Sequence, residues 1–194
     1  RRIIMLVPMR AILDAADKNG YAQGAFNVNA VCQVKAAVDV HQILRSPAII
    51  QGADLANGFM GGRTDFANST LEDKKAGAKN IGAAVKKYAA DSDIPVALHL
   101  DHGKNFDSCI AAIEGGYTSV MIDGSSLPFD ENVELTREVV KYAHERGVTV
   151  EGELGVLAGV EDHVFAATST YTNPLSAIDF FKKTGVDALE ISYG

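Results

Sequence analysis

The chain has 194 residues, a formal net charge of −7 and 47% hydrophobic residues. This length suits a single sizeable core, and the acidic balance argues against nucleic acids or anionic membranes as partners. Cys32 and Cys109 lack ligand-like spacing, and no apolar run approaches the roughly 18 residues of a membrane span. The start RRIIMLV is too short for a signal peptide, so we expect a cytoplasmic protein.

Short β-rich runs alternate along the chain with longer helical patterns. Residues 8–18 predict an opening helix, Ser69 and Glu72 have capping-box spacing, and Asn105 and Asn173 are expected N-caps of later helices. The β-rich runs predict strands at 23–28, 48–51, 96–101, 119–123, 149–153 and 188–192. This alternation is typical of βα units around a parallel sheet.

The expected strands have one aliphatic face and one face that becomes polar toward the C-terminal end. In the strand at 96–101 the even-numbered residues are aliphatic, whereas His99 and Asp101 lie on the other face. A doubly wound sheet needs two aliphatic faces, but a closed βα barrel has an interior whose C-terminal mouth is the active site. We therefore predict an α/β fold of the TIM (β/α)8 type. About six of its eight βα units are expected in a single barrel domain at 1–194, with the C-terminal units missing.

Polar residues converge on the expected C-terminal mouth of this barrel. They are Asn27, Asp101, His102, Asp123, Glu151, Glu153 and Glu190. Crowded carboxylates repel one another without a cation, so a divalent metal is implied, and one imidazole with carboxylates fits zinc or a similar ion. The alternative is that His99 packs inside the barrel, Asp101 caps a turn and His102 is a loop residue.

The segment at residues 155–172 has mixed polarity and no strong period. Structureless loops of this length tend to be functional or disordered. We favour a mobile lid that carries Glu161 over the mouth, with surface disorder as the alternative. His163 in the same segment fits either a ligand or a surface residue, whereas His41 and His144 on helices are interpreted as solvated or packed.

Several stretches of the chain form a specific combination. They are GAFNVN at 24–29, SPAIIQ at 46–51, VALHLDHG at 96–103, GYTSVMIDGS at 116–125 and VTVEGELG at 148–155, followed by GVEDH at 159–163. Together, and in this order, they closely resemble the class II, metal-dependent fructose-bisphosphate aldolases over nearly the whole chain. The resemblance implies a zinc-dependent βα barrel that reversibly cleaves fructose 1,6-bisphosphate to dihydroxyacetone phosphate and glyceraldehyde 3-phosphate in glycolysis and gluconeogenesis. It also implies a homodimer or homotetramer.

The resemblance assigns roles to the residues at the mouth. His102 would be a Zn²⁺ ligand, and Asp101 the acid/base that handles the proton on the C4 oxygen of the substrate. Asp123 and Glu153 match acidic positions that bind or approach the metal, and a second metal or a monovalent cation stays open. A Lewis-acid ion removes the need for a Schiff-base lysine, and no lysine lies on the expected rim strands.

Two further residues receive roles by resemblance, and two departures limit the match. Asn27 matches a substrate-binding position, and Glu161 matches the base that exchanges a proton at C1 of dihydroxyacetone phosphate. The family's other two histidine ligands lie beyond the sixth strand, and Ala53 stands where many relatives have a phosphate-contacting serine. The competing hypotheses are a tagatose-1,6-bisphosphate aldolase and a non-catalytic truncated barrel without the full zinc site.

Overall fold

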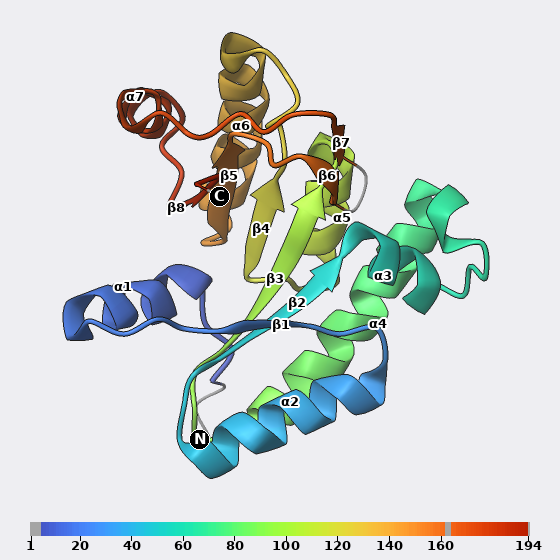
Figure 1. Ribbon diagram of the computed structural model, residues 1–194. Helices are drawn as coiled ribbons and strands as arrows, with labels where there is room; N and C mark the ends of the chain where they lie inside the picture. Colours follow the sequence, from blue (N-terminus) through green and yellow to red (C-terminus); the bar gives the residue numbers. More distant parts are fainter. Residues whose placement is uncertain (1–4, 162–163, 194) are drawn as a thin grey trace.

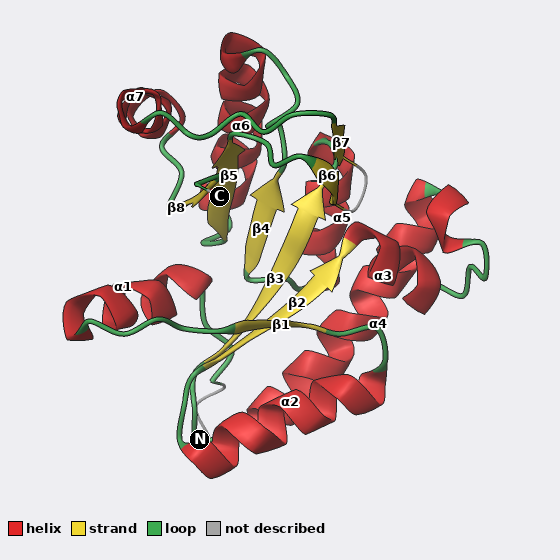
Figure 2. Ribbon diagram, in the orientation of Figure 1, coloured by secondary structure: helices red, strands yellow, loops and turns green. Residues whose placement is uncertain are grey.

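A six-stranded parallel sheet forms the centre of the computed structural model, which describes residues 5–161 and 164–193. Its strands are β1 (Ala25–Asn27), β2 (Ala48–Ala53), β3 (Val96–Gly103), β4 (Ser119–Ile122), β5 (Thr149–Leu154) and β8 (Ala188–Ile191). They lie side by side in chain order without the reversal of a doubly wound sheet (Figure 2). The predicted fold class, a partial TIM barrel, is therefore confirmed.

The helices cover the two faces of this sheet unequally (Figure 1). They are α1 (Met9–Asn19), α2 (Val31–Leu44), α3 (Asp54–Met60), the 3-10 helix η1 (Phe66–Asn68), α4 (Leu71–Ala90), α5 (Phe106–Gly115), α6 (Phe129–His144) and α7 (Pro174–Thr184). Helix α1 lies on the interior face, whereas the long helices α2, α4, α5 and α6 pack on the outer face. Among the described helices, none is both long and apolar enough to cross a bilayer.

The two faces of β3 belong to different hydrophobic clusters. Val96, Leu98 and Leu100 are fully buried in the larger cluster with the outer helices. Ala97 instead packs with Met9 and Ile12 of α1 in a smaller cluster on the interior face. The alternation expected from the sequence is therefore observed, and α1 closes the interior on the side away from the carboxyl ends of the strands.

The start of α4 differs by one residue from the sequence expectation. Its capping box consists of Thr70 and Asp73: the Thr70 hydroxyl accepts from Asp73 N at 3.2 Å, and the Asp73 carboxylate accepts from Thr70 N at 2.8 Å. Ser69 is not the cap, because its N–H donates to Phe66 O and closes η1. The predicted box of Ser69 and Glu72 was wrong, since the preceding 3-10 turn shifts the frame.

The segment 155–172 is not structureless. Strands β6 (Gly159–Glu161) and β7 (Val164–Ala166) form an antiparallel hairpin, and Val156 exchanges two backbone hydrogen bonds with Thr170. The expectation of a long irregular loop was therefore wrong, because backbone pairing of three-residue strands leaves no side-chain period. Asp162 and His163 lie outside the described residues.

Candidate metal centre

The end of β3 is irregular at the two candidate site residues, Asp101 and His102. Its register with β4 shifts between Leu100 and Gly103, so Asp101 and His102 together lie opposite Met121. His102 has a φ of 48°, in the left-handed region that side chains rarely adopt. Bulges re-aim side chains, and backbone strain of this kind is found at functional sites. Strict alternation would point the two residues to opposite faces, and the bulge relieves that restriction.

Three side chains meet at the carboxyl ends of neighbouring strands. His102 from β3, Asp123 after β4 and Glu153 on β5 each offer one ligand atom, and these atoms lie within 4.8 Å of one another. His102 Nδ1 is 3.2 Å from Asp123 Oδ2 and 3.9 Å from Glu153 Oε2. The side chains are only 6–11% exposed. The fold thus brings together the three residues expected from the sequence to bind metal.

The charges of these residues depend on one another. The hydrogen bond with Asp123 raises the pKa of His102 to about 10 against the opposing effect of burial. Burial, and then the charge of Asp123, raises the pKa of Glu153 to about 9. Burial also acts to raise the pKa of Asp123, but hydrogen bonds from His102 and Ser125 hold it below its usual range. Without a cation the cluster therefore retains protons that a metal ion would displace.

The atom that most clearly fits a cation is Glu153 Oε2. It is buried, and no described donor gives it a hydrogen bond. A buried carboxylate oxygen that accepts no hydrogen bond is costly to ionise, and a divalent cation would remove that cost. One imidazole nitrogen with two carboxylate oxygens is a donor set suited to zinc or a similar divalent ion. The residues present therefore fit a divalent metal.

Asp101 lies beside this cluster and is held from the first strand. Asn27 Nδ2 on β1 donates to Asp101 Oδ2 at 2.7 Å. On the same face of β3, His99 is buried, with Nε2 3.2 Å from Glu151 Oε2 and Nδ1 2.8 Å from Ser119 Oγ. His99 thus packs inside the barrel, as the alternative interpretation proposed, whereas Asp101 faces the mouth.

Two more acidic residues of the expected rim have separate positions. Glu190 on β8 is in register with Glu153, and its negative charge acts on both Glu153 and His102. Glu161 is the last residue of β6, and its side chain lies outside the described part of the structure. The contacts of the proposed lid carboxylate with the mouth therefore stay a prediction.

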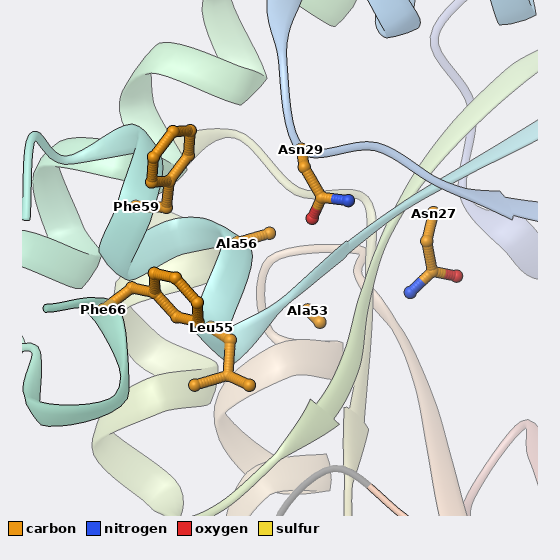
Figure 3. A pocket seen from close by; sticks show the side chains of 7 residues that line it. All are labelled: Asn27, Asn29, Ala53, Leu55, Ala56, Phe59 and Phe66. Atoms are coloured by element: carbon orange, nitrogen blue, oxygen red, sulfur yellow. The ribbon is translucent and has the colours of Figure 1, made fainter. Parts of the chain in front are cut away.

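A pocket of about 480 Å³ opens next to Asn27 at the carboxyl end of β2 (Figure 3). Asn27 and Asn29 border it on one side, and Phe59 and Phe66 on the other. Its floor comes from α3, a helix that is not among those predicted from the sequence. The available signal was the four-residue spacing of Leu55 and Phe59, which is too short a pattern to define a helix.

Fold and site define a class of protein, a βα barrel with an acidic and imidazole cluster at its carboxyl mouth. A sequence model of the family described as "Fructose-bisphosphate aldolase class-II" matches residues 7–194, and the chain belongs to this family. The fructose-bisphosphate aldolase of Treponema pallidum (strain Nichols) is 48% identical over 193 residues, which are 97% of this chain and 54% of that protein. The fructose-bisphosphate aldolase of Geobacillus stearothermophilus is 40% identical over 191 residues, which are 97% of this chain and 61% of that protein.

Solved structures agree with this assignment. The YdjI aldolase from Escherichia coli K12 has a TM-score of 0.76 and 29% identity over 97% of this chain and 61% of its own. The fructose-bisphosphate aldolase of Campylobacter jejuni, at 24% identity and a TM-score of 0.77, supports the fold and covers 96% of this chain and 57% of that one. The chain thus spans 54–61% of the length of these relatives.

Proposed function

We propose that the protein is a class II aldolase that reversibly cleaves fructose 1,6-bisphosphate into dihydroxyacetone phosphate and glyceraldehyde 3-phosphate. The observation that carries this proposal is the buried cluster of His102, Asp123 and Glu153 beside Asp101, in a chain of this family. We propose Zn²⁺ as the ion, with His102, Asp123 and Glu153 holding or approaching it. When bound, it would supply Lewis-acid polarisation of a substrate oxygen.

Asp101 is proposed as the acid/base of the cleavage step. In the cleavage direction it removes the proton from the C4 hydroxyl, which becomes the aldehyde oxygen as the bond between C3 and C4 breaks; in the reverse direction it returns that proton. The Asn27 amide supports this role, because its hydrogen bond to Oδ2 fixes the carboxylate and leaves Oδ1 for substrate. Asn27 is also proposed to contact the substrate itself.

Glu161, on the 155–172 segment, is proposed as the base that exchanges the proton at C1 of dihydroxyacetone phosphate. Closing such a segment over the mouth excludes water from a reactive carbanion. The six described strands of the sheet contain no lysine, so they offer no amine for a Schiff base. This supports metal-assisted cleavage over the alternative covalent route.

Family membership supports the remaining proposals. We place the reaction in glycolysis and gluconeogenesis in the cytoplasm, and we propose a homodimer or homotetramer. Residues 1–194 are proposed to belong to one barrel domain, because five consecutive parallel pairings join all six strands.

Aldol cleavage by the full-length protein tests this proposal. Fructose 1,6-bisphosphate and tagatose 1,6-bisphosphate are compared with Zn²⁺ present, after removal of metal by a chelator, and after Zn²⁺ is restored. We expect cleavage of the fructose isomer that is lost with chelation and regained with Zn²⁺. Preference for the tagatose isomer would reassign the substrate, and cleavage of neither with Zn²⁺ present would overturn the enzyme assignment.

A further inference from the structure

Asn132 on α6 contacts both strand ends that carry the carboxylates of the candidate metal centre. It lies on the outer side of the sheet and is 1% exposed. Its Nδ2 donates to the backbone carbonyl of Glu153 at 2.9 Å. We infer that Asn132 is a positioning residue that sets the geometry of the carboxylates of Asp123 and Glu153. The inference rests on the proposed metal centre.

The orientation of the Asn132 amide is fixed by its own helix. Thr136, one turn later and fully buried, donates from Oγ1 to Asn132 Oδ1 at 3.1 Å. The backbone N–H of Asn132 donates to Pro128 O in the first turn of α6. Because the hydroxyl occupies the amide oxygen, the amide nitrogen must face the carbonyl of Glu153. Thr136 therefore determines which end of the amide meets the strand.

The same side chain lies against the residue that follows Asp123. A Cβ on Gly124 would be 2.3 Å from Asn132 Oδ1 and 2.7 Å from its Cγ. Real side chains do not approach this closely, so the backbone after Asp123 is in direct contact with Asn132 only because residue 124 is glycine. One buried amide thus links the ends of β4 and β5.

The two carboxylates depend on this contact to different degrees. Asp123 Oδ1 is held independently, because Ser125 donates to it from N at 3.0 Å and from Oγ at 2.6 Å. Glu153 Oε2 has no hydrogen-bond donor among the described residues. Apart from its interactions with His102, 3.9 Å away, and with Asp123, this carboxylate is positioned by the backbone that Asn132 holds. Loss of Asn132 is expected to affect metal binding chiefly through Glu153.

Cobalt binding by the full-length protein tests the inference with a readout other than activity. Co²⁺ alone is titrated into the metal-free protein, and its affinity and visible absorption bands are recorded with the thermal unfolding midpoint. The first variant, Asn132→Asp, keeps the shape but turns an acceptor toward the Glu153 carbonyl. The second, Thr136→Val, keeps the side-chain volume and removes only the hydroxyl that donates to the Asn132 amide oxygen. The matched control is Asn57→Ala, because Asn57 is also a buried helical asparagine but accepts from the Tyr117 hydroxyl at 2.7 Å.

We expect Asn132→Asp to weaken Co²⁺ binding by about 10- to 100-fold and to change the absorption bands, as outer partners of metal ligands do. Thr136→Val should cause a smaller change of the same kind, which keeps the test decisive if Asn132→Asp fails to fold. Asn57→Ala should lower the unfolding midpoint and leave Co²⁺ affinity and bands as in the wild type. Equal Co²⁺ affinity and bands in the wild type and the Asn132 and Thr136 variants, or the same loss in Asn57→Ala, would overturn the inference alone. A wild-type protein that binds no Co²⁺ would overturn the proposed metal centre, and the inference with it.

Discussion

His102 shows how a single residue combines local strain with chemistry. The sequence places it at the end of a buried strand, and resemblance gives it a ligand role, but simple alternation points it away from Asp101. The bulge at the end of β3 and the left-handed backbone of His102 resolve this conflict. A single irregular residue leaves no periodic signal, so this geometry could not be predicted from the pattern of the strand.

The backbone strain at His102 can be measured with two substitutions that both remove the imidazole. A left-handed conformation costs an L-residue about 1–2 kcal/mol, and glycine adopts it freely. We expect metal-free His102→Gly to be more stable than metal-free His102→Ala by about 1 kcal/mol in urea unfolding. If His102→Ala were equally or more stable, the backbone at this position would be unstrained and the bulge would have another cause.

Among whole elements, the strands could be predicted best. All six expected strands of the sheet are present, and their ends agree within two residues. Aliphatic faces and glycine or proline boundaries specify such strands locally. Helix α3 was missed because it is held mainly by packing on the distant α4, and the hairpin of β6 and β7 because backbone pairing of three-residue strands leaves no side-chain period.

Helix α3 is anchored by a buried ion pair between Asp54 and Lys74 of α4. Their side chains are 2% and 16% exposed, so removing one partner leaves a buried charge without compensation. We expect Lys74→Met to lower the free energy of unfolding by about 3–5 kcal/mol. The double variant Lys74→Met with Asp54→Asn should recover part of that loss in a double-mutant cycle. Additive losses would show that the pair is not energetically coupled.

Asp187 joins α1 and α6 to the base of the sheet. Its carboxylate accepts from Arg10 Nη1 at 2.9 Å and from Val150 N at 2.8 Å, and lies 2.9 Å from His144 Nε2. Burial acts to raise the pKa of Asp187, but these hydrogen bonds outweigh it and lower the pKa from the ordinary value of 3.8. The folded state therefore favours the ionised carboxylate, and this stabilisation is present above the unfolded-state pKa.

The corresponding prediction concerns Asp187→Asn. Hydrogen bonds to a charged group contribute about 1.5–3 kcal/mol, so the variant should lose about that much stability at neutral pH. The difference from the wild type should shrink as the pH falls below 3.8 through the lowered folded-state pKa, where Asp187 itself becomes protonated. Urea unfolding of both proteins across this pH range measures the difference in stability. A difference that stays constant to the lowest pH would contradict the linkage.

At the scale of the whole described structure, residues 5–161 and 164–193, the sheet has two open edges, β1 and β8. Apolar side chains are exposed near both, including Phe26 and Ile43 on one side and Ile178 and Ile191 on the other. Unpaired edges and apolar patches of this kind favour association. We expect residues 1–194, expressed alone, to self-associate in light scattering and to bind a hydrophobic dye. A dye-negative monomer at micromolar concentration would contradict this expectation.

The sequence predicted which residues gather at the candidate site better than it predicted their individual roles and contacts. The carboxyl ends of parallel strands meet at one mouth, so residues from three strands could be grouped from the sequence. Their roles came from family resemblance, because residue type alone does not separate a ligand from a proton carrier. The supporting contacts of Asn132 could not be predicted, since they join a helix to two strand ends through one buried amide.

The central claim is that His102, Asp123 and Glu153 hold the metal while Asp101 moves the proton. Zinc content and aldol cleavage, measured together on the full-length wild type, Asp101→Ala and His102→Ala, test it most directly. The account predicts that Asp101→Ala retains zinc but loses cleavage, whereas His102→Ala loses both. Equal loss of zinc in the two variants, or undiminished cleavage in Asp101→Ala, would contradict it.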